Sequence, residues 1–132
     1  IRDRERVKDV PETLPALLRA EKVQKRAAKF NFDFANVSQA VGKLEEEIGE
    51  FQAALAEKDE KRAAEEGGDL LFAAVNVLRL AGVESERALA AATEKFIERF
   101  LRTEELAKAD GREMATLSAE ETDIYYNEAK KR

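Results

Sequence analysis

The chain contains no cysteine and no histidine. Disulfides, thiolate metal sites, imidazole bases and His-based zinc or di-iron sites are therefore excluded. Any chemistry must rely on carboxylates, cations, hydroxyls and metal ions. Only two prolines, Pro11 and Pro15, and six glycines occur in 132 residues. So few helix breakers, with abundant Ala, Glu, Lys, Arg and Leu, favour long helices.

Long hydrophobic runs and an excess of positive charge are also missing. The most apolar stretch, residues 70–83, is too short to span a bilayer and is interrupted by Asn76 and Arg79. No secretory signal is visible. The net charge of −5 lacks the basic footprint of a nucleic-acid binder. We therefore expect a cytoplasmic protein without a membrane or nucleic-acid partner.

Apolar spacing predicts an all-α fold of four main helices and a short C-terminal helix. The first three helices are expected at about Leu14 to Phe30, from near Asn36 or Ser38 to about Lys58, and at about Glu60 to Leu80. The fourth is expected at about Glu86 to Lys108, after an N-cap at Ser85. The short last helix should begin at a capping box of Ser118 and Glu121 and run through Lys130. Gly82 is expected to end the third helix, and Asp110-Gly111 to form a turn.

The second helix carries the clearest apolar seam, and the third is apolar nearly all round. The seam alternates spacings of four and three through Val37, Val41, Leu44, Ile48, Phe51 and Leu55. A third helix apolar on most sides should be buried on several of them. We expect an antiparallel bundle whose four-helix core is completed by a second copy of the chain, because a homodimer is the simplest way to cover that helix.

Acidic residues gather on the second and third helices. Glu46, Glu47 and Glu50 fall within about 100° of arc, where like charges repel unless a cation lies among them. Glu66 and Asp69 share one stripe with Arg62 and Asn76, and Glu65 lies one step aside. Because it directly precedes a very apolar segment, Asp69 is expected to be partly buried. All-oxygen sites of this kind suit Mg²⁺ or Mn²⁺.

Cations on the fourth helix complete the pattern. Lys95 and Arg99 are i,i+4 neighbours that could reach phosphate oxygens. Acids on two helices for a metal and cations on a third for phosphates together indicate a phosphate-processing site.

A structural interpretation stays open beside this functional one. Glutamate runs are usually solvated helix faces, and Lys95 and Arg99 could pair with Glu94 or Glu98 on the surface. Asn76 could cap a buried backbone group. The aromatic residues Phe30, Phe32 and Phe34 are more often core than base-stacking groups.

The chain resembles the MazG nucleoside triphosphate pyrophosphohydrolases of the all-α NTP pyrophosphatase superfamily. Their pattern of Glu-Glu-x-x-Glu followed by Glu-x-x-Asp appears here as residues 46–50 and 66–69. Flanking segments at residues 23–28, 68–72, 75–76 and 94–100, and the ending from Leu117 to Lys130, are also similar. The likeness is greatest to the C-terminal MazG domain of two-domain bacterial proteins, so we expect the chain to be part of a longer protein.

The resemblance implies an activity: hydrolysis of ribo- and deoxyribonucleoside triphosphates to a monophosphate and pyrophosphate by a dimer. Residues 1–11 are charged and irregular and are expected to form a flexible arm or linker, while the resemblance implies a catalytic domain over residues 12–132. The rival hypotheses are a non-catalytic nucleotide-binding module of a longer protein and a plain dimerisation bundle.

The resemblance also implies roles for individual residues. The implied metal ligands are Glu47, Glu50, Glu66 and Asp69, for Mg²⁺ with Mn²⁺ as a substitute. The implied catalytic acids are Glu46, Glu47 and Glu50, with Glu46 either an outer acid or a group that helps to orient water. The implied substrate-binding residues are Lys43, Arg62, Glu65, Asp69, Asn76, Lys95, Arg99, Tyr126 and Lys130. Phe34 and Tyr126 stand where Trp is common in the family, and Gly67 where a larger apolar residue is usual.

Overall fold

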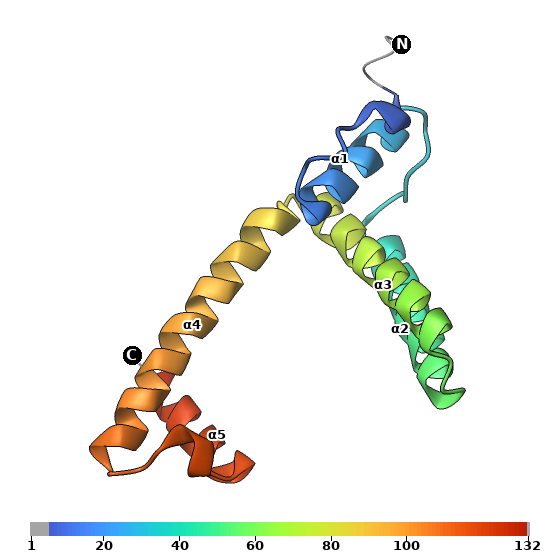
Figure 1. The fold of residues 1–132 in the computed structure, drawn as a ribbon. Coiled ribbons are helices and arrows are strands. Elements are labelled where there is room, and N and C mark those ends of the chain that lie inside the picture. Colours follow the sequence, from blue (N-terminus) through green and yellow to red (C-terminus); the bar gives the residue numbers. More distant parts are fainter. Residues whose placement is uncertain (1–5, 132) are drawn as a thin grey trace. The chain divides into compact units, whose positions relative to one another are not determined.

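A computed structural model describes residues 6–131, and in this range the chain is helical without any strand. Figure 1 shows the elements in order: the 3₁₀ turn η2 (Val7–Asp9), then α1 (Ala16–Ala28), α2 (Val37–Ala56), α3 (Glu60–Leu80), α4 (Ser85–Ala109), the 3₁₀ turn η3 (Met114–Thr116) and α5 (Ala119–Ala129). The predicted all-α class is confirmed, and each helix begins and ends within two residues of its expected bounds.

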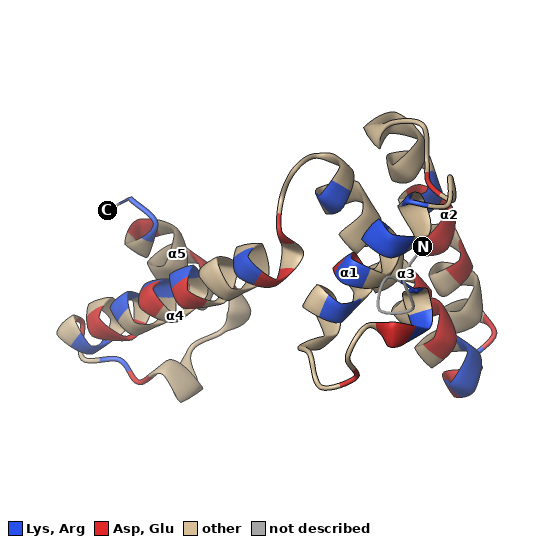
Figure 2. Ribbon diagram, turned by 90° about the horizontal axis from the view of Figure 1, so that it is seen from above, with Lys and Arg blue, Asp and Glu red and all other residues tan. Residues whose placement is uncertain are grey.

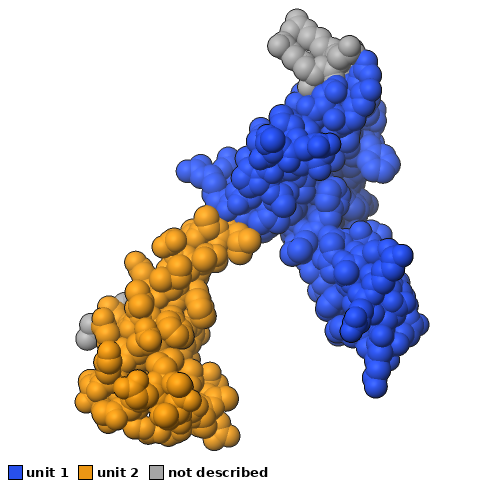
Figure 3. Space-filling model, in the orientation of Figure 1, with its two compact units in different colours: residues 1–88 blue, residues 89–132 orange. Residues whose placement is uncertain are grey.

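The chain divides into two compact units, residues 1–88 and 89–132 (Figure 3). The first contains η2, α1, α2, α3 and the first turn of α4. The second contains the rest of α4, η3 and α5. The predicted domain bounds at residues 1–11 and 12–132 stay a prediction, as does the four-helix dimer core.

The first unit is built around an antiparallel hairpin of α2 and α3, which lie side by side (Figure 1). The side chain of Asn36 accepts the Gln39 N–H at 2.9 Å and begins α2. The side chain of Asp59 accepts the Arg62 N–H at 3.1 Å and begins α3 after a connection of only three residues. Such a short reversal fixes the register of the two helices, and with it which acids face one another.

Helix α1 packs against α3 and is joined to the start of α4 by buried polar contacts. The buried carboxylate of Glu21 accepts the Ser85 N–H at 3.4 Å and pairs with Lys25 at 3.3 Å. Glu86 accepts the Leu18 N–H at 3.3 Å, which satisfies one of the free N–H groups at the start of α1. The Ser85 hydroxyl has no partner among the described residues, so its predicted role as a side-chain N-cap is wrong.

The flexible arm predicted over residues 1–11 stays a prediction, but part of its described range has regular structure. Residues 7–9 form η2, Val10 is only 1% exposed, and Arg26 donates to the Arg6 carbonyl at 2.9 Å. Residues 1–5 lie outside the described range. Within residues 6–10 only Val10 is buried, and residues 6–9 stay exposed although Arg26 contacts the Arg6 carbonyl.

The second unit holds α5 against the end of α4 through polar contacts around a tight turn. Gly111 has a φ of +72°, which confirms the turn expected at Asp110-Gly111. The capping box of Ser118 and Glu121 is also confirmed, and Arg112 donates to Glu121 at 2.6 Å. Tyr125 donates to Asp110 at 2.7 Å, which ties α5 back to the turn.

Charged residues are spread along the helices, and acids and bases are mixed along α4 (Figure 2). No helix within residues 6–131 combines the length and the apolarity that crossing a membrane requires. Several large apolar side chains are nevertheless exposed on the hairpin. Leu71 and Phe72 of α3 are 58% and 43% exposed, so the single chain does not bury the third helix on the several sides that its sequence led us to expect.

Candidate functional site

Three of the predicted acids converge across the α2–α3 hairpin. Glu47 of α2 and Glu66 and Asp69 of α3 each place one carboxylate oxygen within 4.8 Å of the other two. Glu47 is buried, Glu66 is half-buried and Asp69 is exposed. The expectation that Asp69 is partly buried is therefore wrong for the single chain, because its neighbours Leu71 and Phe72 are themselves left uncovered.

The electrostatics of this acid cluster (Glu47, Glu66 and Asp69) favour a cation. The pKa of the Glu66 carboxyl is raised, first by partial burial and then by the negative charges of Asp69, Glu50 and Glu47. Arg62 opposes this effect only in part. Carboxylates gathered this closely are the hard oxygen ligands that Mg²⁺ and Mn²⁺ prefer. The donor set of the described residues thus fits a divalent cation.

Lys43 lies beside the cluster on α2. Its ammonium contacts Glu47 at 3.1 Å and Glu46 at 3.4 Å, and these hydrogen bonds, the one to Glu47 first, raise the Lys43 pKa. Lys43 therefore stays positively charged next to the site. Glu46 is exposed and joins the cluster only through this shared lysine.

Glu50 and Arg62 lie one turn further along the hairpin. Arg62 contacts Glu50 at 3.4 Å and also pairs closely with Glu57, and the pair with Glu57 is the main reason that its pKa is raised. Glu50 is not one of the three acids whose oxygens converge, although its charge is felt by Glu66. Glu65 is exposed on α3 and is not one of the three converging acids. The implied roles of these three residues stay predictions.

A cavity of the first unit joins the acids to the aromatic segment 30–34. Its volume of about 960 Å³ is that of a small-molecule site, and its walls include Lys43, Glu47, Asp69 and Asn76. Phe30 and Phe32, at the other end, are 51% and 79% exposed. These two side chains are not core in the single chain, contrary to the structural interpretation of the aromatic segment.

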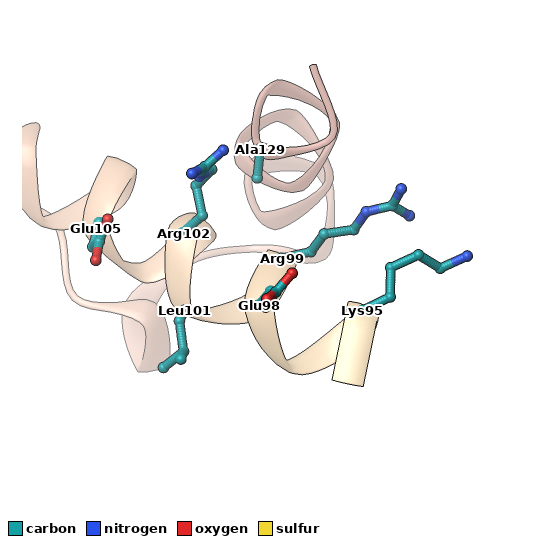
Figure 4. A pocket seen from close by; sticks show the side chains of 7 residues that line it. All are labelled: Lys95, Glu98, Arg99, Leu101, Arg102, Glu105 and Ala129. Carbon is teal, nitrogen blue, oxygen red and sulfur yellow. The ribbon is translucent and has the colours of Figure 1, made fainter. Parts of the chain in front are cut away.

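The remaining predicted residues belong to the second unit. Lys95 and Arg99 line a surface hollow of α4 together with Arg102, and Figure 4 shows the Lys95 and Arg99 side chains extending to the same side. Neither forms an ion pair with Glu94 or Glu98 among the described residues. The Lys130 ammonium lies 5.1 Å from the centre of the Tyr126 ring, which also contacts Phe96. Their approach to the acids stays a prediction.

Sequence reasoning missed a polar group in the cavity wall made of Gln24, Asp33 and Arg79. Arg79 donates to Asp33 at 2.6 and 3.1 Å and to Asn76 at 2.8 Å. A signal was present, because an arginine and an asparagine interrupt the most apolar stretch of the chain. Its partner Asp33 lies 46 residues away, beyond the reach of spacing arguments.

Fold and site together define an all-helical protein with a carboxylate cluster of the metal-binding kind, two of whose acids line a nucleotide-sized cavity. The sequence model of the family described as "MazG nucleotide pyrophosphohydrolase domain" matches residues 35–101, half of the chain, including every residue of the acid cluster. The chain belongs to this family.

Three relatives match almost the whole chain. The nucleoside triphosphate pyrophosphohydrolase of Escherichia coli (strain K12) is 42% identical over 125 residues, and the nucleoside triphosphate pyrophosphohydrolase/pyrophosphatase MazG of Thermotoga maritima is 39% identical over 125 residues. The uncharacterized protein YabN of Bacillus subtilis (strain 168) is 46% identical over 122 residues. The matches cover 93%, 95% and 92% of this chain, but only 48%, 48% and 25% of those proteins. The chain thus spans about half the length of the first two and a quarter of the third.

Proposed function

We propose that this chain hydrolyses nucleoside triphosphates, ribo- or deoxyribo-, to nucleoside monophosphates and pyrophosphate. The observation that supports the proposal most strongly is the convergence of Glu47, Glu66 and Asp69 within 4.8 Å, with Glu47 and Asp69 also lining a nucleotide-sized cavity. Membership of the MazG family and the names of the E. coli and T. maritima relatives point to the same reaction. Because nucleoside triphosphates are a cytoplasmic pool, we place the protein in the cytoplasm.

The proposed cofactor is Mg²⁺, with Mn²⁺ as a substitute. The proposed ligands are Glu47, Glu66 and Asp69, joined by Glu50 from the next turn of α2. Support comes from the all-oxygen donor set and from the raised pKa of Glu66. Partial burial is the main cause of that rise, and the negative charges of neighbouring acids add to it; a cation would offset this repulsion. When bound, such an ion neutralises phosphate charge and lowers the pKa of bound water.

The side chains around the acids bind and orient the reactants. Glu46, joined to Glu47 through Lys43, holds the attacking water. Lys43 and Arg62 contact phosphate oxygens. Both cations are already held beside carboxylates on the hairpin, so little side-chain entropy is lost when phosphate binds. From the other elements we propose substrate contacts by Glu65, Asn76, Lys95, Arg99, Tyr126 and Lys130.

We also propose that two copies form a dimer with a four-helix core made of two α2–α3 hairpins. Val41, Ile48 and Leu55 of α2 follow one another at seven-residue spacing and are 36%, 40% and 54% exposed. Leu71 and Phe72 add exposed apolar surface on α3. A heptad stripe left open on a hairpin is typical of a helix face that a second hairpin covers.

The reaction is tested by product analysis with a panel of ordinary and modified nucleoside triphosphates. We expect equal amounts of pyrophosphate and monophosphate in Mg²⁺, and neither product in excess chelator. Release of inorganic phosphate with a diphosphate would contradict the proposed bond cleavage. A folded, metal-loaded protein that binds nucleotide without releasing pyrophosphate would favour the non-catalytic binding module.

A further inference from the structure

Arg79 connects three elements at the end of the cavity away from the acid cluster. Its side chain is only 9% exposed, and its guanidinium forms a two-pronged pair with Asp33 at 2.6 and 3.1 Å. The same group donates to the side-chain oxygen of Asn76 at 2.8 Å and, more weakly, to Gln24 at 3.4 Å. All four residues line the cavity. Together these four hydrogen bonds hold the Arg79 guanidinium in one orientation.

These contacts fix the orientation of the Asn76 amide. An arginine can only donate hydrogen bonds, so the Asn76 side-chain oxygen must face Arg79. The amide nitrogen Nδ2 is then left as a donor, and it has no acceptor among residues 6–131. Because Asn76 is half-buried in the cavity wall, a ligand in the cavity is a natural acceptor for it.

The position of Asn76 along α3 indicates which part of a nucleotide it meets. Asn76 follows Asp69 by seven residues, which is about 10 Å along a helix axis. If the phosphates lie at the acid cluster, a donor that far away meets the sugar or the base. This step rests on the proposed function.

Asp33 anchors the arrangement in the aromatic segment 30–34. The hydrogen bond from Arg79 is the main reason that the Asp33 pKa is lowered, so this carboxylate stays ionised. Asp33 also accepts the Phe34 N–H at 2.8 Å. The pair of Asp33 with Arg79 therefore fixes segment 30–34 to α3. This segment contributes Phe30 and Phe32 to the cavity wall.

We propose that Arg79, anchored by Asp33, is a positioning residue for nucleoside recognition. It holds the Asn76 amide so that Nδ2 donates to a carbonyl oxygen, ring nitrogen or hydroxyl oxygen of the nucleoside. Arg79 acts through Asn76 and plays no part in binding the phosphates.

Calorimetric titration with two ligands separates this role from a structural one. A nucleoside triphosphate and inorganic triphosphate, each with Ca²⁺, are titrated into the wild type, Arg79→Met, Arg79→Lys and Asn76→Ala. Arg79→Met should weaken nucleotide binding about tenfold and leave inorganic triphosphate within about twofold. Arg79→Lys keeps the positive charge but loses the bidentate pair with Asp33, so its loss of nucleotide affinity should be intermediate. Arg87→Met, which breaks an exposed pair with Glu84, is the matched control and should change neither affinity.

The most direct test is whether the effects of Arg79 and Asn76 on nucleotide affinity are coupled. If Arg79 acts through Asn76, the double variant Arg79→Lys/Asn76→Ala should bind nucleotide no more weakly than Asn76→Ala alone. Independent, additive losses would overturn the proposal, and so would equal losses for nucleotide and inorganic triphosphate. If Arg79→Met does not fold, the same comparison is made with Arg79→Lys. Pyrophosphate release by the wild type is measured separately: its absence, with the binding pattern intact, would overturn the proposed function and leave this inference standing.

Discussion

Replacing Gly67 by alanine should stabilise the protein. Gly67 lies inside α3 between Glu66 and Gly68, and a glycine in a helix interior costs about 1 kcal/mol relative to alanine. An added Cβ would lie 3.6 Å from Cε1 and 3.9 Å from Cδ1 of Phe51, which is ordinary van der Waals contact. Nothing has to move, so we expect the free energy of unfolding to rise by about 1 kcal/mol.

In a chain of this length that gain corresponds to a Tm about 4 °C higher. The measurement is helicity during heating by circular dichroism, without metal and at a single protein concentration, because dimerisation makes Tm depend on concentration. Gly68→Ala is the companion variant, since its Cβ meets nothing within 4 Å. A lower Tm for Gly67→Ala beside a higher one for Gly68→Ala would refute the contact with Phe51. Lower values for both would refute the argument from helix propensity.

Three further outcomes follow from the acid cluster, the capping box and the open apolar stripe. Mg²⁺ at ten times its Kd should stabilise the wild type by about 1.4 kcal/mol and raise its Tm by about 5 °C; Glu66→Gln should lose most of this shift in the same thermal scan. The pKa of Glu121 is lowered to about 2, first by the Ser118 backbone N–H and then by Arg112. The wild type should therefore be more stable than Glu121→Gln by a constant amount above the ordinary carboxyl pKa, and this difference should vanish as the pH falls through about 2. The free energy of unfolding is measured by urea titration at each pH. A difference that persists below pH 2 would contradict the lowered pKa of Glu121. Ile48→Glu should give a monomer in sedimentation experiments, and an unchanged mass would refute the proposed interface.

Local signals in the sequence predicted the helices and their ends. Asn36, Ser118 and Gly82 each act through backbone groups within about five residues, so the chain itself carries the information. The Ser85 prediction failed because Ser85 is already the first residue of α4, with its N–H held in a buried contact by Glu21, 64 residues away. The start of a helix depends on tertiary contacts as well as on the local capping residue, and the sequence does not show those contacts.

The acids of the site could be found by spacing, but their arrangement could not. Glu47 lies nearer the apolar seam of α2 than Glu50 does, but spacing alone does not say which acids of α3 either residue meets. The hairpin register buries Glu47 against Glu66 and Asp69, whereas Glu50 is drawn to Arg62. Register depends on the three-residue connection between α2 and α3, which periodicity does not specify. The pair of Asp33 and Arg79 was out of reach for the same reason, because it joins distant segments.

The central claim is that the acid cluster performs hydrolysis, and pyrophosphate release by two matched variants tests it most directly. Glu66→Gln removes one carboxylate of the cluster, and Glu45→Gln makes the same change at an exposed position of α2 outside it. With a nucleoside triphosphate and Mg²⁺, we predict that Glu66→Gln loses at least about a hundredfold in rate, while Glu45→Gln keeps the rate of the wild type. Equal rates for both variants would contradict the account.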